Sequence, residues 1–264
     1  MTESSQPTLA QVITLAKEAG QIIRASIDDD HTIGYKSAVD VVTEADKESE
    51  DYILDQIHQH FPNHAIITEE SGELEGDSEN CWIIDPLDGT VNYSHHLPIY
   101  SISIAFRHRG QLQLGVVYDP SLEECFSAER GQGAFLNEKK ISVSNAKELI
   151  GCLLVTGFPY ERQSADYARA LHLFGHLTTI TQGVRRLGSA ALDMCYVACG
   201  RLDAYWELSI HLWDIAAAAL IVQEAGGIIR GIHGQTHFLT PPYALISSAP
   251  GVYDKLLAEI ESIP

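Results

Sequence analysis

Four acidic residues occupy positions where the sequence pattern indicates the end of a strand, a turn or the start of a helix. Glu69 and Asp85 each follow an apolar run typical of a buried strand. Asp88 lies three residues after Asp85, and Asp214 opens an alanine-rich run. Carboxylates in apolar surroundings repel one another unless a cation offsets their charge. Oxygen ligands without His or Cys are typical of Mg²⁺ or Mn²⁺ rather than Zn²⁺. The pattern therefore predicts a divalent-cation site, and paired ions of this kind are used to hydrolyse phosphate esters.

Residues 82–93 have two interpretations. Asp88-Gly89 between apolar flanks is a strong signal for a hairpin turn. In the other interpretation a strand ends at Asp85 and Pro86 interrupts its hydrogen-bond ladder. Gly89 and Thr90 then open a short helix whose free N–H groups face an anion. This segment alone leaves both interpretations open.

The first half of the chain must supply the elements that hold these acids. Residues 8–27 predict an amphipathic helix with a capping box at Thr8 and Gln11. A second helix is expected from Thr43 to about residue 61, with Asp46 in its first turn, where the charge suits the helix dipole. Residues 65–68 predict a short buried strand. A loop rich in Gly and Glu is expected at 71–80.

The hydrophobic pattern of the sequence changes twice after residue 80. Alternating apolar and polar residues predict an antiparallel meander with strands at 101–106, 111–118, 124–129, 134–137 and 140–144. From about residue 150 the pattern alternates between strands (152–156, 202–207, 244–248) and helices (164–177, 189–198, 211–225, 253–260). We therefore expect two subdomains packed as one unit, residues 1–147 and 148–264.

Composition limits the classes of function. The 264 residues carry a net charge of −19 with 45% hydrophobic residues. So acidic a chain disfavours non-specific binding to nucleic acid or to an anionic membrane. No apolar run is long enough to span a membrane, and the N-terminus lacks the features of a secretory signal. Five cysteines without a Cys-x-x-Cys motif argue against a disulfide framework. These features favour the cytoplasm.

Other chemistry finds weaker support. His172 and His176 are four residues apart on an expected helix, but no neighbouring acid completes a zinc motif. The sequence contains neither a Gly-x-Ser-x-Gly elbow nor a Walker motif. Lys36, in an expected loop before a short strand, is ordinarily a surface lysine. Arg185-Arg186 could contact a second phosphate of a substrate, although a surface pair is the usual interpretation.

Four motifs resemble those of the inositol monophosphatase family. Asp85-Pro86-Leu87-Asp88-Gly89-Thr90, followed by Asn92, resembles its main signature. Residues 213–216 (Trp-Asp-Ile-Ala) and 224–227 (Glu-Ala-Gly-Gly) resemble its second signature at the expected separation. Residues 43–46 and 68–71 match two lesser motifs. The resemblance covers nearly the whole chain; Tyr93 replaces the usual phenylalanine, and about the last 35 residues match loosely.

The resemblance implies an α/β fold and a set of metal ligands. The family fold is a layered αβαβα sandwich, with an antiparallel sheet in the N-terminal half and a mixed sheet in the C-terminal half. Glu69, Asp85 and the carbonyl of Leu87 would hold a first Mg²⁺. Asp85, Asp88 and Asp214 would hold a second, and a third, weaker ion would lie by Glu69. Mn²⁺ is an alternative, and lithium would inhibit.

The resemblance also implies roles around the metals. Gly89 and Thr90 would donate backbone N–H groups to the phosphate, while Thr90, Asp46 and Glu69 would orient and activate the attacking water. The remaining substrate contacts would come from Asp88, Asp214, Ala190, Glu207 and Lys36.

The implied activity is hydrolysis of a phosphorylated polyol, with myo-inositol monophosphate as the expected substrate, by a homodimer. Glu207 favours a polyol over a nucleotide, because a carboxylate accepts hydrogen bonds from hydroxyls. Relatives act on fructose 1,6-bisphosphate, adenosine 3′,5′-bisphosphate, histidinol phosphate or NADP with the same metal core. Some bacterial relatives also serve as regulatory partners of the transcription machinery, and a catalytically inactive binding module is a third possibility.

Overall fold

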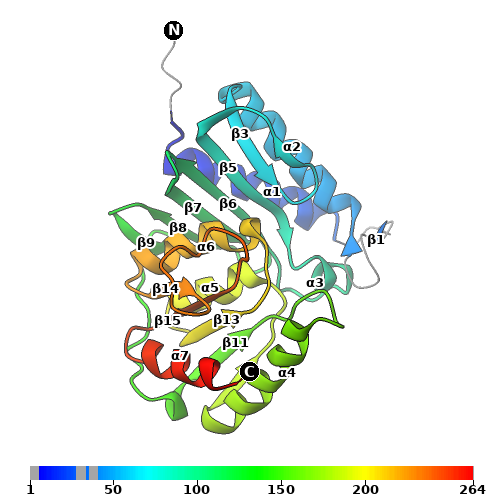
Figure 1. The fold of residues 1–264 in the computed structure, drawn as a ribbon. Helices are drawn as coiled ribbons and strands as arrows, with labels where there is room; N and C mark the ends of the chain where they lie inside the picture. The colour runs from blue at the N-terminus through cyan, green and yellow to red at the C-terminus, as the bar shows by residue number, and fades with distance from the viewer. Residues whose placement is uncertain (1–5, 28–33, 36–40, 264) are drawn as a thin grey trace.

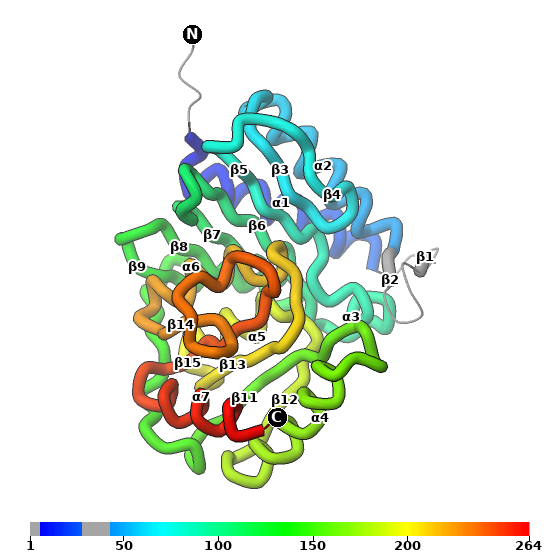
Figure 2. Tube along the Cα trace, in the orientation of Figure 1, coloured from blue at the N-terminus to red at the C-terminus, as the bar shows by residue number. Residues whose placement is uncertain are grey.

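The computed structural model describes residues 6–27, 34–35 and 41–263, and within them it has five layers (Figure 1). Helices α1 and α2 cover one face of an eight-stranded sheet. Helices α5 and α6 lie between that sheet and a five-stranded sheet, and α4 and α7 cover the outer face of the latter. Figure 2 shows the same order along the chain trace, from blue N-terminal helices to the red C-terminal helix. The predicted αβαβα sandwich is confirmed.

The eight-stranded sheet is built entirely from residues before 141, in the order β10-β9-β8-β7-β6-β5-β3-β4. Its strands are β3 His64–Thr68, β4 Gly72–Leu74, β5 Asp77–Asp88, β6 Ser101–His108, β7 Gln111–Asp119, β8 Glu124–Glu129, β9 Gly133–Leu136 and β10 Lys139–Lys140. The meander from β5 to β10 is antiparallel as predicted. The sheet is nevertheless mixed, because β3 and β5 are parallel. Only antiparallel strands can be joined by a tight turn, and β4 fills the connection between these two.

Two sequence predictions in this half are wrong in detail. The expected loop at 71–80 contains β4 and the first residues of β5. The strand expected at 140–144 ends at Lys140, because the chain then crosses to the helix layer: the Val143 N–H donates to the Ala225 carbonyl. A small antiparallel pair, β1 Gly34–Tyr35 and β2 Val41–Val42, stands apart from both main sheets.

The five-stranded sheet is mixed, as predicted, in the order β12-β11-β13-β15-β14. Its strands are β11 Leu153–Thr156, β12 Gly183–Arg185, β13 Ala204–Glu207, β14 Ile228–Gly231 and β15 Leu245–Ser248. The sequence pattern predicted β11, β13 and β15 but missed β12 and β14. Both missed strands lie at the edges of the sheet, and β12 has only three residues, too few for alternation to show.

The helices begin and end close to their predicted limits. They are α1 Leu9–Ala25, α2 Glu44–His60, α3 Thr90–Ser94, α4 Ala165–Ile180, α5 Ala190–Ala198, α6 Leu212–Glu224 and α7 Tyr253–Ser262, with one 3₁₀ turn at Leu149–Gly151. Thr8 and Gln11 form the expected capping box of α1. Asp46 occupies the third position of α2 and accepts from the Thr43 N–H.

Helix α6 is alanine-rich because it is enclosed between the two sheets. Ala216, Ala217, Ala218 and Ala219 are fully buried. A Cβ on Gly115 of β7 would stand 2.6 Å from the Ala217 carbonyl oxygen, so glycine is required for this close approach. The central core includes residues from Cys81 to Leu245 and therefore spans both halves. None of the described helices is both long and apolar enough to cross a membrane.

Candidate active site

A bulge in β5 brings two carboxylates to the same side of the sheet. In a regular strand, side chains three residues apart point to opposite faces. The pairing with β6 shifts by one residue between Asp85 and Asp88, at Pro86-Leu87. The strand therefore does not end at Asp85 but continues across the bulge to Asp88. Proline, which has no N–H to donate, is well suited to a bulge. The hairpin interpretation is wrong, because α3 follows directly.

Helix α6 supplies the third carboxylate. Asp214 lies in its first turn, where its Oδ2 accepts a hydrogen bond of 2.9 Å from the His211 N–H. One oxygen each of Asp85, Asp88 and Asp214 lies within 4.8 Å of the other two. The acids come from two different layers, so packing of α6 against the eight-stranded sheet creates the cluster.

Burial and neighbouring acids raise the pKa of all three carboxylates. For Asp85 and Asp214, burial raises the pKa well above its usual value, and the neighbouring acids raise it further. Burial raises the pKa of Asp88 to about 6. Among the described residues no Lys or Arg forms an ion pair with any of the three. The oxygen-only donor set and its uncompensated charge fit a hard divalent cation.

The cluster opens into a cavity of about 360 Å³ between the two halves of the chain. The first half lines it with Glu69, Leu87, Gly89 and Thr90 beside the clustered acids. The second half contributes Phe158, Tyr160, Arg162, Tyr167 and Arg186. Glu69 lies outside the group of three, but its charge raises the pKa of Asp85. The structure thus brings together seven predicted residues: Glu69, Asp85, Leu87, Asp88, Gly89, Thr90 and Asp214.

Asp46 and Thr90 form a hydrogen-bonded pair behind this cavity. The Thr90 hydroxyl lies 2.9 Å from Asp46 Oδ1 and 3.0 Å from the Leu87 carbonyl oxygen, and can donate its one proton to either. The other Asp46 oxygen accepts from the N–H and the hydroxyl of Thr43. Burial raises the pKa of Asp46 to about 6, although these hydrogen bonds lower it. Helix α2 therefore fixes the orientation of the first residue of α3.

Gly89 provides the backbone conformation at this corner. Its φ is +96°, in the left-handed region that favours glycine. A Cβ there would lie 2.9 Å from the Ile99 carbonyl oxygen, so a side chain is also excluded by space. Gly89 and Thr90 consequently present their backbone at the edge of the cavity.

The N-terminus of α5 holds Asp88. Its Oδ2 accepts from the Ser189 hydroxyl at 2.6 Å and from the Ala191 N–H at 2.8 Å, while Oδ1 lies 3.3 Å from the Ala190 nitrogen. These bonds lower the pKa of Asp88 against the effect of burial. Ala190, predicted as a substrate contact, thus bonds to a predicted metal ligand. Sequence reasoning missed Ser189 and Ala191, although Ser189 was predicted to begin this helix.

A smaller cavity of about 60 Å³ adjoins the first and contains Glu207. Burial raises the pKa of Glu207 to about 7, and the Tyr205 hydroxyl donates to its Oε2. Asp193, which the sequence patterns did not single out, also lines this cavity and has no hydrogen-bond partner for Oδ1 among the described residues. Arg186 borders both cavities.

The other sequence candidates lie elsewhere. Lys36 falls outside the described residues. His176 contacts Glu259 of α7 at 2.6 Å, so that face of α4 packs against the C-terminal helix. A further cavity of about 300 Å³, bordered by α1 and α2, is lined largely by apolar groups with Glu18 and His60 and has no cluster of acids.

Known proteins resemble this chain over nearly its full length. Residues 4–264 match the model of the inositol monophosphatase family. The Nus factor SuhB of Pasteurella multocida is 44% identical over 258 residues, which are 97% of this chain and 96% of that protein.

Two solved structures also match nearly the full length of this chain. The extragenic suppressor protein suhB of Bartonella henselae has a TM-score of 0.91 and 32% identity, and the match covers 96% of this chain and 99% of that one. The inositol monophosphatase of Anabaena (Nostoc) has a TM-score of 0.87 and 40% identity, covering 97% and 96%. This chain belongs to the inositol monophosphatase family.

Proposed function

We propose that this protein is a divalent-cation-dependent phosphomonoesterase that hydrolyses a phosphorylated polyol, with myo-inositol monophosphate as the expected substrate. The observation that carries this proposal is the cluster of Asp85, Asp88 and Asp214, which line a cavity of about 360 Å³ and each have one oxygen within 4.8 Å of the other two. Membership of the family supports a phosphatase.

The donor set fits Mg²⁺, with Mn²⁺ as an alternative. Asp85, Asp88 and Asp214 would hold one ion, Glu69, Asp85 and the Leu87 carbonyl another, and a third would lie by Glu69. A bound divalent ion would supply charge neutralisation at the phosphate and would lower the pKa of water.

Residues of the chain itself orient the reaction. Asp46 accepts a hydrogen bond from the Thr90 hydroxyl, which fixes the rotamer of Thr90 at the cavity edge. Glu69 lines the same cavity, so Thr90 can position a water molecule while a carboxylate takes its proton. The backbone N–H groups of Gly89 and Thr90 would face the phosphate. The Asp88 hydrogen bonds to α5 keep that carboxylate in place while substrate binds.

Glu207 suits a polyol. It is buried in the adjoining cavity, and the Tyr205 hydroxyl occupies one of its oxygens. The other oxygen can accept a hydrogen bond from a substrate hydroxyl. Fructose 1,6-bisphosphate and histidinol phosphate are the remaining alternatives.

The test is phosphate release from myo-inositol 1-phosphate. We expect turnover with Mg²⁺, no turnover in EDTA, and inhibition by Li⁺. A panel of phosphomonoesters identifies the preferred substrate. Metal-independent release, or no release from any phosphomonoester, would contradict the proposal.

The relatives named Nus factor support a second candidate function, as a protein partner of the transcription machinery. Asp88→Asn separates the two functions, because a partner surface does not require the metal ligand. We expect an affinity-tagged Asp88→Asn variant to retain the partners that the wild type captures from its native lysate. We also propose a homodimer, which light scattering of the purified protein tests.

A further inference from the structure

Three aromatic rings form a chain of stacks that ends beside the third carboxylate of the cluster. The ring centroids of Tyr160 and His211 lie 6.3 Å apart, with the ring planes inclined by 29°. Those of His211 and Trp213 lie 4.7 Å apart, with an inclination of 16°. Both separations are in the range of favourable aromatic pairs. Asp214 directly follows Trp213, so the chain of stacks reaches a proposed metal ligand.

His211 holds Asp214 through its own backbone. It is the N-cap residue of α6, and its N–H donates to Asp214 Oδ2 at 2.9 Å. Asp88 is held differently, by a hydroxyl and an N–H group of α5. Among the described residues the His211 N–H is the one hydrogen-bond donor to the Asp214 carboxylate. The orientation of this ligand therefore depends on where the His211 backbone points.

The helix itself does not fix the backbone of His211. An N-cap residue lies outside the regular helix, and His211 has the extended angles φ −104° and ψ 164°. The chain before it is held by the Ile210 N–H, which donates to the Tyr243 carbonyl at 3.0 Å. The contacts of the His211 ring with its two aromatic neighbours hold the residue itself. Displacement of the ring would move the Cα of His211 and turn its N–H away from Asp214.

Tyr160 belongs to a different part of the chain from the acids. Residues 157–164 join β11 to α4 and carry both Tyr160 and Arg162. The segment is attached to α4 by Phe158, whose ring centroid lies 5.8 Å from those of Tyr167 and Phe174. Tyr160 lines both the large and the small cavity. The stack on His211 therefore connects the second-half wall of the site to the start of α6.

The core does not require this stack. Tyr160 is 56% exposed and His211 is also exposed, so their rings bury little apolar surface. Helix α6 is anchored independently, because Leu212 and residues 215–222 are buried. Removal of the Tyr160 ring should therefore leave the fold intact while it releases His211.

We propose that Tyr160 is a positioning residue of the metal site: by stacking on His211 it orients the N–H that holds Asp214, and so it sets the affinity of the acidic cluster for a divalent cation. This inference rests on the proposed function, because it takes Asp214 to be a metal ligand. It adds a residue that bonds to neither the metal nor Asp214 and acts through His211 alone.

The test measures binding of Mn²⁺ to the full-length protein by electron paramagnetic resonance of the free ion, without a phosphate ester. The binding step that Asp214→Asn abolishes identifies the ion held by Asp214. We expect Tyr160→Ala to raise the Kd of that step by about three- to tenfold, the loss of one aromatic pair. Tyr160→Phe is the matched control, because it keeps the ring, and should retain the wild-type Kd. An unchanged Kd in Tyr160→Ala, or an equal rise in Tyr160→Phe, would overturn the proposal.

Two further measurements separate positioning from a structural role. The unfolding temperature in EDTA should be equal for the wild type, Tyr160→Ala and Tyr160→Phe, whereas a structural role would lower it in Tyr160→Ala. The double variant Tyr160→Ala/His211→Ala should bind Mn²⁺ as His211→Ala does, because Tyr160 acts through His211. Additive losses of affinity would overturn this route.

The binding measurement also separates this inference from the proposed activity. If Tyr160→Ala weakens Mn²⁺ binding but the wild type hydrolyses no phosphomonoester, the phosphatase proposal fails and the positioning role stands. If the wild type hydrolyses a phosphomonoester and Tyr160→Ala binds Mn²⁺ equally well, only the positioning role fails. A wild type that binds no Mn²⁺ would overturn both.

Discussion

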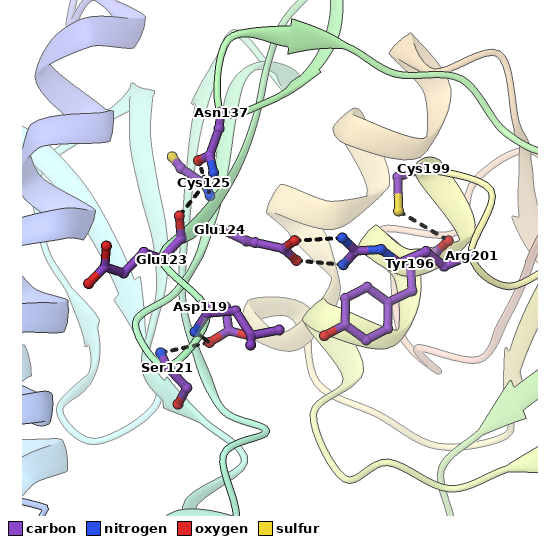
Figure 3. A network of polar contacts seen from close by, with 10 residues as sticks. Asp119, Ser121, Glu123, Glu124, Cys125, Asn137, Tyr196, Cys199 and Arg201 are labelled. Carbon is purple, nitrogen blue, oxygen red and sulfur yellow. Dashed lines mark hydrogen bonds and ion pairs between the residues drawn. The ribbon is translucent and has the colours of Figure 1, made fainter.

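Two groups of buried or half-buried acids in this molecule have opposite surroundings. At the active site, Asp85, Asp88 and Asp214 converge without an ion-pair partner among the described residues. Where β7 ends and β8 begins, Glu124 pairs with Arg201, and Asp119 lies nearby with Ser121 as its hydrogen-bond partner (Figure 3). Both Arg201 Nη atoms lie 2.5 Å from a Glu124 oxygen, and the guanidinium lies over the Tyr196 ring at 5.1 Å.

The second group is structural. Glu124 belongs to the eight-stranded sheet and Arg201 follows α5, so their bidentate pair joins two layers. Asp119 accepts from the N–H groups of Ser121 and Leu122, which shape the turn before β8. Burial raises the pKa of Asp119, whereas the hydrogen bonds from Leu122 and Ser121 lower it, and the charge of Arg201 lowers it further.

The difference separates the two groups of acids without reference to motifs. Where the chain supplies its own cation, acids hold elements together. Where three acids meet with neighbouring acids as their main charged influence, folding leaves a repulsion that a bound cation or protonation can relieve. Hydrogen bonds to Asp88 from Ser189 and Ala191 keep the site in place without neutralising it.

The largest expected effect follows from removing one charge of the uncompensated group. Asp88→Asn should lower Mg²⁺-dependent turnover by more than about a hundredfold, since even outer-shell partners of metal ligands typically cost 10- to 100-fold. The fold should survive because the amide keeps the shape and relieves repulsion. Phosphate release and circular dichroism check both parts. Turnover near the wild-type rate would show that this cluster does not hold the catalytic metal.

A smaller effect is expected from filling the space beside Glu207. The Cβ of Gly157→Ala would stand 2.2 Å from Glu207 Oε2 and should displace either the carboxylate or the segment that carries Arg162. We expect kcat/KM to fall by roughly 10- to 100-fold, as misplacement by about 1 Å can produce. Gly175→Ala is the matched control, because nothing lies within 4 Å of its Cβ on exposed α4. Equal effects of the two variants on kcat/KM would show that the close approach of Gly157 to Glu207 does not matter for activity.

The sequence predicted the elements of this fold well where their pattern was long. Capping residues Thr8 and Thr43 marked the starts of α1 and α2, and alternation marked β6 to β8. Pattern failed where elements were short or depended on distant partners. Strand β12 has three residues, and β4 exists because β3 offers it an edge.

The site was predictable in type but not in its connections. Acids at strand and helix ends predicted a cation site, and the motif resemblance proposed its ligands, of which the structure clusters Asp85, Asp88 and Asp214. The bulge at Pro86-Leu87 and the hydrogen bonds from α5 to Asp88 depend on packing between layers, which no local sequence pattern encodes. Arg162 and Tyr160 lay in a segment without periodicity, and only the folded chain brings them to the cavity.

Metal binding should stabilise the protein through the same unpaired acids. At a Mg²⁺ concentration 100 times its Kd, the gain is about 2.7 kcal/mol, or a rise in Tm of roughly 5–10 °C for a chain of this size. Asp214→Asn should reduce that rise. Thermal unfolding in Mg²⁺, compared with EDTA at matched ionic strength, measures it. An equal rise in the wild type and the variant would place the stabilising ion elsewhere.

The smallest effect is expected at the paired acids. Arg201→Gln removes the bidentate pair with Glu124, whose side chain is 17% exposed, and the contact with Tyr196. We expect the free energy of unfolding to fall by about 1–2 kcal/mol, more than for an average surface pair. Activity should stay at the wild-type level because Arg201 lines neither cavity of the site. Arg109→Gln is the control. It breaks the ion pair between Arg109 and Glu79, whose side chains are 70% and 56% exposed respectively. We expect it to change the free energy of unfolding by less than about 1 kcal/mol. If Arg201→Gln reduced turnover without reducing stability, the division between paired structural acids and unpaired functional acids would be wrong.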